Sequence, residues 1–153
     1  MARFDRESLP GFVNPQSYLQ AEGLELLSPA GTVGVIPYSE VKFVCFVRDF
    51  QQGEPRKELR LFGTRPKMEG LWLRLRFRDG DQMDGMLLNN LLQLDPYGYS
   101  VVPPDPEFQN QRIFVPRAAL SEAKVMGVVG SALRIRKPKP VAKEQIELFG
   151  KDE

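Results

Sequence analysis

Residues 71–78 have the sequence LWLRLRFR, in which apolar and mostly basic side chains alternate with a period of two. The apolar set is Leu71, Leu73, Leu75 and Phe77, and the other set is Trp72, Arg74, Arg76 and Arg78. Only an extended strand places alternate residues on opposite faces, so this segment predicts a strand with one face in a core. The Asp79-Gly80 pair then predicts a tight turn, after which a strand resumes as far as Leu88.

Strand signals recur along most of the chain and are separated by turn residues. Strands are predicted at 23–28, 31–38, 41–50 and 112–116, with a short one at 59–63. Pro29-Ala30 predicts a hairpin turn between the first two, and the Pro-rich segment 101–111 predicts a loop. Residues 117–129 predict one helical turn followed by a strand, and Cys45 is expected in the core. The predicted fold class is mainly β.

Composition excludes several kinds of catalytic and metal site. The chain has 153 residues, a net charge of +1, one cysteine and no histidine, so histidine-dependent triads and metal sites are excluded. The carboxylates of Asp79, Asp81 and Asp84 lack the spacing of a calcium loop and predict a solvated hairpin tip. We therefore expect no metal, no cofactor and no enzymatic activity. The charged N-terminus and the absence of a long apolar run predict a cytoplasmic protein without membrane contact.

Two pairs of segments share a sequence pattern. Residues 3–14 resemble 76–89, with Gly11 matching Gly85, and residues 35–46 resemble 114–125, with Pro37 matching Pro116. The order of the matches is preserved, which predicts two copies of one small barrel module. Reuse of short patterns by unrelated β segments is the alternative. The predicted organisation is a first module at 1–63, a second at 70–130 and a basic flexible arm at 131–153.

The second module resembles the Sm-like family, including its bacterial Hfq branch. The resemblance covers residues 71–127 and rests on LRLRFRDGDQMDGML, with Asp79-Gly80, Gly85 and Leu87; a copy of the same pattern falls within residues 3–50. It implies two small, repeated SH3/Sm-like barrels. Hfq binds RNA with a tyrosine-lysine-histidine cluster, where this chain has VPRAA at 115–119. The resemblance therefore implies the fold and not that RNA site.

Two basic segments are candidates for nucleic-acid contact. Trp72, Arg74, Arg76 and Arg78 share one strand face, which suits a phosphate backbone and a stacked base. The alternative is a solvated face whose arginines pair with acids on neighbouring strands. In the arm, Arg134, Arg136, Lys137 and Lys139 precede the first acid, which suits weak non-specific DNA contact or a solubilising linker.

The segment QIELF at 145–149 resembles the peptide with which bacterial polymerases and repair proteins bind the DNA sliding clamp. The resemblance implies that Leu148 and Phe149 enter an apolar pocket, Ile146 adds apolar contact and Gln145 fixes the register. The alternative is that this segment folds back on the body as a terminal strand.

The function expected from the sequence is a non-enzymatic adaptor of the bacterial cytoplasm. Its QIELF peptide binds the DNA sliding clamp, while the basic arm makes weak contact with DNA. One alternative is a small-barrel protein that binds nucleic acid through its basic strand face. Another is a structural or oligomerisation module. The sequence leaves the oligomeric state and the cellular process open.

Overall fold

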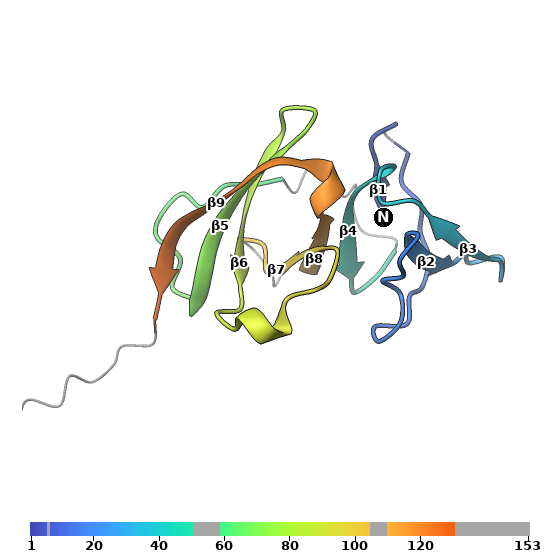
Figure 1. Ribbon diagram of the computed structural model, residues 1–153, viewed down its shortest axis with the longest axis horizontal. Coiled ribbons are helices and arrows are strands. Elements are labelled where there is room, and N and C mark those ends of the chain that lie inside the picture. The colour runs from blue at the N-terminus through green and yellow to red at the C-terminus, as the bar shows by residue number, and fades with distance from the viewer. Residues whose placement is uncertain (6, 51–58, 105–109, 131–153) are drawn as a thin grey trace, which may run out of the picture.

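The computed structural model describes residues 1–5, 7–50, 59–104 and 110–130, and its fold is mainly β, as predicted (Figure 1). Its strands are β1 (Ala2–Arg3), β2 (Leu24–Leu27), β3 (Val33–Ile36), β4 (Val41–Val47), β5 (Gly70–Phe77), β6 (Gln82–Leu87), β7 (Gly98–Val101), β8 (Asn110–Pro116) and β9 (Leu120–Val129). Two short 3-10 helices, η2 (Leu91–Gln93) and η3 (Arg117–Ala119), lie between strands.

The strands form three antiparallel sheets. A four-stranded sheet has the order β1-β4-β8-β7, a three-stranded sheet has the order β6-β5-β9, and β2 pairs with β3 alone. An isolated bridge between Met86 and Val102 connects β6 to the chain beyond β7. The β5, β6 and β9 strands lie at one end of the molecule and the β2–β3 hairpin lies at the other, with β4 and β8 between them (Figure 1).

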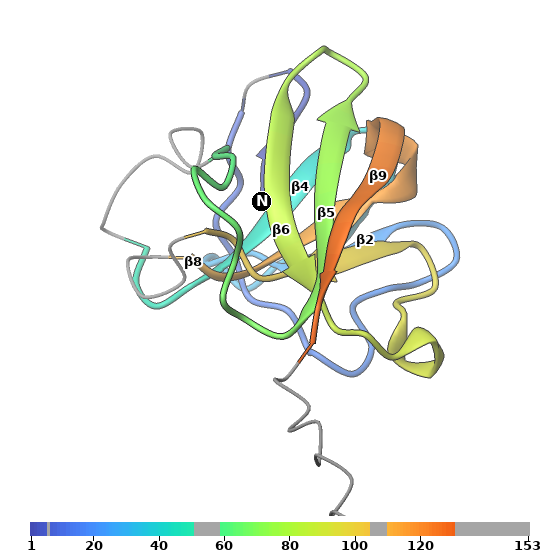
Figure 2. The same cartoon turned by 90° about the vertical axis from the view of Figure 1, so that its left-hand side faces the viewer.

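The period-two segment forms β5, the central strand of its sheet (Figure 2). Leu73, Leu75 and Phe77 are buried, as the alternation predicts, because every second side chain points into the core. The predicted turn follows, with Gly80 at a φ of 94°, a conformation that residues with a Cβ atom rarely adopt. The register of the hairpin therefore agrees with the sequence pattern, because the buried Leu75 lies opposite the buried Met83.

In the described part of the chain, two hydrophobic clusters form the core, and the β4–β8 pair contributes to both. The larger cluster contains Leu73, Leu75 and Phe77 together with Phe43 from β4. The smaller contains Tyr18, Leu24, Val41 and Val44 together with Phe114 from β8. Phe43 and Phe114 are each buried mainly among residues of the other half of the chain, so the two halves are packed together.

The predicted barrels are not closed in the described residues. β8 pairs with β7 on one edge and with β4 on the other, so one sheet contains strands from both halves of the chain. β3 and β9 each pair with one strand only, so neither half closes into a barrel. The internal duplication is not confirmed and stays a prediction. The modules predicted at 1–63 and 70–130 share a sheet through β4 and β8.

Most predicted strands are present, and three local predictions need correction. Residues 59–63 do not form a strand; they run beside β6, where the Asp84 N–H donates to the Arg60 carbonyl at 2.9 Å. The short β1 and the glycine-led β7 were not predicted, because their sequences carry little apolar alternation. Cys45 is partly buried against the larger cluster rather than enclosed in it.

Candidate interaction surfaces

The side chain of Arg74 is bound to a buried carboxylate on the neighbouring strand. Its Nε and one terminal nitrogen donate to the two Asp84 oxygens at 2.8 and 2.9 Å. Asp84 is fully buried and also accepts from the Phe62 N–H at 2.9 Å. Burial alone would raise the pKa of Asp84, but the hydrogen bonds from Arg74 and Phe62 outweigh it and lower that pKa.

Trp72 is half-buried and packs edge-on against Phe62, with ring centroids 6.0 Å apart. Its indole nitrogen is buried near Asp84 and helps to lower the pKa of that carboxyl, without the geometry of a hydrogen bond. Because its ring already contacts Phe62, Trp72 offers less area for stacking on a base than the sequence suggests.

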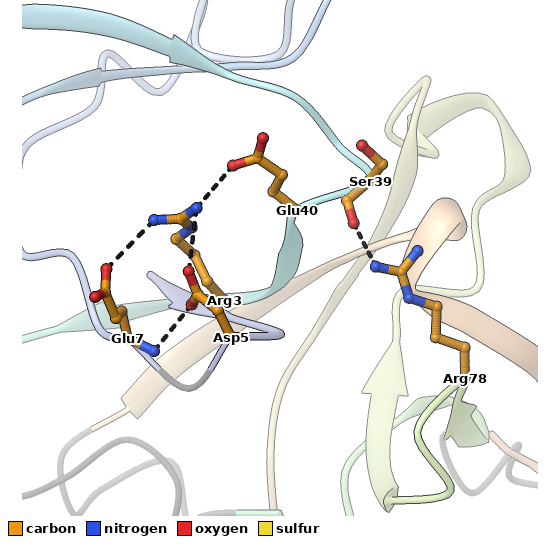
Figure 3. A network of polar contacts seen from close by, with 6 residues as sticks. All are labelled: Arg3, Asp5, Glu7, Ser39, Glu40 and Arg78. Carbon is orange, nitrogen blue, oxygen red and sulfur yellow. Dashed lines mark hydrogen bonds and ion pairs between the residues drawn. The ribbon is translucent and has the colours of Figure 1, made fainter.

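The remaining arginines of this face also contact groups within the chain. Arg76 is exposed and lies opposite Gln82, whose amide oxygen accepts from Nε and one terminal nitrogen of Arg76 at 3.3 and 3.2 Å. Arg78 donates to the Ser39 carbonyl (Figure 3) and lies over the Phe4 ring, 3.9 Å from its centroid. The predicted nucleic-acid face is therefore one face of β5 whose guanidinium groups all have protein partners, and its role stays a prediction.

Lys42 is a buried cation that pairs with two partly exposed carboxylates at the hairpin tip. Its ammonium is bound by the carboxylates of Asp79, at 2.5 Å, and Asp81, and it lies 5.2 Å from the centroid of the Phe77 ring. Burial would raise the pKa of Asp79, but the hydrogen bond from Lys42 lowers it. Two of the three carboxylates weighed as a metal site thus neutralise Lys42, and the third binds Arg74. Among the described residues, no group of three or more potential ligands could hold a metal ion.

A third cluster of charges joins the N-terminal segment to the turn before β4. Arg3 pairs with Asp5 at 3.1 Å, with Glu7 at 3.4 Å and with Glu40 at 2.9 Å (Figure 3). This cluster could not be predicted from the sequence, because Glu40 is 37 residues away from Arg3 in the chain. It holds the segment after β1 against the rest of the molecule and presents no unpaired cation.

Among the described residues, exposed apolar side chains gather in several places that sequence reasoning missed, and three of these lie on η2, β3 and β9. The first comprises Leu88, Leu91 and Leu92 around η2; the second comprises Val33 and Val35 on β3; the third comprises Val125, Met126 and Val128 on β9. Strand periodicity predicts which residues can point inward, but it does not say whether another element covers them. These three surfaces are candidates for contact with a partner.

The candidate residues of the arm and the docking peptide lie outside the described residues. They are Arg134, Arg136, Lys137, Lys139, Gln145, Ile146, Leu148 and Phe149. The structure thus neither brings them to the β5 face nor separates them from it. Within the described part of the chain, no helix is long and apolar enough to cross a membrane.

Comparison with known proteins gives one match. The search of curated proteins and the search of solved structures found no significant similarity. A family model described as a family of unknown function, DUF6982, matches residues 1–127. The match includes both hydrophobic clusters and β9 as far as Gly127, and it ends before the arm. Since the model covers most of the sequence, the chain belongs to the DUF6982 family.

Proposed function

We propose that this protein is a non-enzymatic adaptor that binds the DNA sliding clamp through residues 145–149. The observation that carries the proposal is the QIELF sequence, which places a glutamine three residues before a Leu-Phe pair. A short peptide binds such a pocket mainly through a few buried apolar side chains, here Leu148 and Phe149. The glutamine amide supplies the hydrogen bonds that fix the register.

The chemistry of the body supports a scaffold rather than a catalyst. The buried carboxylate of Asp84 is neutralised by Arg74, and the buried ammonium of Lys42 is neutralised by Asp79 and Asp81. The pKa values of Asp79 and Asp84 are both lowered, which moves them away from the neutral range that a general base needs. These groups stabilise the fold and are not poised for proton transfer.

The arm gives the adaptor a weak contact with DNA. Arg134, Arg136, Lys137 and Lys139 lie within six residues of one another and shortly before the docking peptide. Each phosphate that such a cation neutralises releases a counterion, so the contact weakens as salt rises. A protein bound to a clamp is held close to duplex DNA, where even weak contacts of this kind are populated.

The test is a binding assay with a labelled peptide of residues 143–153 and purified bacterial sliding clamp. Saturable micromolar binding is expected, and the full-length protein should displace the peptide. A scrambled peptide of identical composition is the control, because it keeps the charge and hydrophobicity but loses the spacing. Equal binding of both peptides, or of neither, would reject the proposal.

A structural or self-associating role is the second candidate. The specific observation in its favour is that β3 and β9 each have one edge with no partner strand among the described residues. This role is compatible with clamp binding, because the docking peptide lies outside both strands.

A further inference from the structure

β3 and β9 are two of the edge strands of the described chain. β3 pairs only with β2, and β9 pairs only with β5. The two strands lie at opposite ends of the molecule (Figure 1). Val33 on β3 is 60% exposed and Val125 on β9 is 54% exposed. An edge of unpaired N–H and C=O groups between apolar side chains is a template for pairing with another strand.

The chain already contains one junction between its halves, formed by β4 and β8. These strands are antiparallel, with Val44 opposite Phe114, Cys45 opposite Ile113 and Phe46 opposite Arg112. On its other edge β4 pairs with β1, and on its other edge β8 pairs with β7. The junction therefore shows which two kinds of strand edge fit together in this protein.

The free edge of β9 matches the edge that β4 uses. Each strand follows a short turn that begins at a proline, Pro37 before β4 and Pro116 before β9. Each pairs antiparallel with the first strand of its own half, β1 or β5. The sequence match of 35–46 with 114–125 aligns the two strands with an offset of 79 residues.

The free edge of β3 likewise matches the edge that β8 uses. Val35 lies opposite Glu25 on β2, and Phe114, 79 residues later, lies opposite Ser100 on β7. A glycine begins each pair: a Cβ atom on Gly23 or on Gly98 would lie 2.2 Å from the facing carbonyl oxygen, that of Ile36 or Val115. The same close approach of backbones thus occurs at both places.

We propose that this protein self-associates head to tail, with β3 of one copy adding to the free edge of β9 in another copy. The pairing is antiparallel and follows the register of β4 with β8. Carried over by the offset of 79 residues, that register puts Ala123 opposite Val35, Lys124 opposite Gly34 and Val125 opposite Val33 of the neighbour. It brings together the most exposed large apolar side chains of the two strands.

A third exposed residue fits the same arrangement. Within the chain, Tyr18 packs edge-on against Phe114, with ring centroids 5.9 Å apart. The bridge of Phe12 to Leu27 in the first half is equivalent to the bridge of Met86 to Val102 in the second half. Phe12 and Met86 are 74 positions apart, and the same offset makes Leu92 the equivalent of Tyr18. Leu92 is 96% exposed, and in the assembly it would cover Val35 of the neighbour.

One contact limits how far the pairing extends. Arg65 donates to the Val128 carbonyl at 3.0 Å, so the end of β9 already has a side-chain partner. The pairing therefore uses the part of β9 before Val128. Because the two edges differ and lie at opposite ends, the interface is heterologous, and successive copies close into a ring or extend as a filament.

The test measures mass in solution by light scattering or sedimentation for the full-length protein and two variants, Val33→Asp and Val125→Asp. The wild type is expected to exceed the monomer mass increasingly as concentration rises. Each variant, with one edge blocked by a charge, is expected to be a monomer. An equimolar mixture is expected to form a dimer, because the intact β9 of one variant can pair with the intact β3 of the other.

Leu61→Asp is the matched control, since Leu61 is exposed and lies on the β6 side of the sheet, away from β9. It should keep the wild-type mass. A monomeric wild type at all concentrations, or variants that keep the wild-type mass, would overturn the proposal. So would a Val33→Asp variant that still dimerises, because that result means that β9 pairs with β9.

Hydrogen exchange on the wild type provides a measurement that does not depend on the variants folding. Amides of β3 and of β9 before Val128 should exchange more slowly at high than at low protein concentration. Concentration-independent exchange in both strands would contradict the pairing, since backbone hydrogen bonds across the junction must protect these amides.

Discussion

Arg74 on β5 and Asp84 on β6 lie directly opposite each other in the hairpin, and two hydrogen bonds of 2.8 and 2.9 Å join them. The carboxylate is fully buried, whereas the arginine is partly exposed. The pair therefore stabilises the fold asymmetrically, because loss of the arginine leaves a charge without its main partner inside the protein.

Replacing Arg74 with methionine should destabilise the protein by about 3 kcal/mol, because the buried Asp84 then loses both hydrogen bonds from its charged partner and keeps the one from the Phe62 N–H. The matched change Arg76→Met, on the same face of β5 but exposed, should alter the free energy of unfolding by less than about 0.5 kcal/mol. Urea unfolding of both variants measures the difference. Equal losses would mean that the buried pair has no special role.

Stability should fall as the pH is lowered below about 4. The folded state lowers the pKa values of Asp79 and Asp84 from an ordinary value of 3.8, so the unfolded state binds protons first. The resulting stabilisation is fully present above the unfolded pKa and is lost as the pH falls through the lowered folded-state values. Asp84→Asn should flatten the dependence of the unfolding free energy on pH between about 2 and 5. An unchanged slope would assign the acid sensitivity to other carboxyl groups.

The cluster around Lys42 should respond differently to loss of its cation and loss of its anions. Asp79→Asn with Asp81→Asn leaves an ammonium that is only 9% exposed without a counter-charge, which should cost about 3 kcal/mol. Lys42→Met leaves two carboxylates that water can reach, and it should cost about 1 kcal/mol. Thermal unfolding of the two variants provides the comparison, and the reverse order of stability would refute this account.

Gly98→Ala should destabilise the β7–β8 pair by about 1–3 kcal/mol. The added methyl group would lie 2.2 Å from the Val115 carbonyl oxygen and 2.7 Å from the Phe114 ring, so the strands must move apart. Gly63→Ala is the control, since no atom lies within 4 Å of the position of its Cβ. If both variants unfold at the same denaturant concentration, the close approach at Gly98 is not required.

The alternation of β5 predicted the strand, its buried face and its turn, because a period of two has one structural interpretation. The same pattern could not show that Arg74 binds Asp84, because the choice of partner depends on the register between strands. The pairing of β4 with β8 was equally out of reach, since it joins segments separated by about 65 positions. Phe43 and Phe114 were predictable as apolar strand residues, but not as side chains buried in the opposite half.

The exposed apolar residues show the limit of sequence reasoning most clearly. Val125 has the alternation of a core residue and lies opposite the buried Leu73, yet it is exposed because no element of the described chain covers that part of β9. Periodicity reports which face a side chain is on, whereas exposure depends on where other strands end. The proposed self-association follows from this difference.

The measurement that tests the adaptor proposal most directly is a calorimetric titration of purified sliding clamp with the full-length protein and with Leu148→Ala/Phe149→Ala. The account predicts micromolar binding by the wild type and a loss of at least about 2 kcal/mol in the variant, because the two apolar side chains fill the pocket. Binding of equal strength by both proteins, or no binding by the wild type, would contradict it.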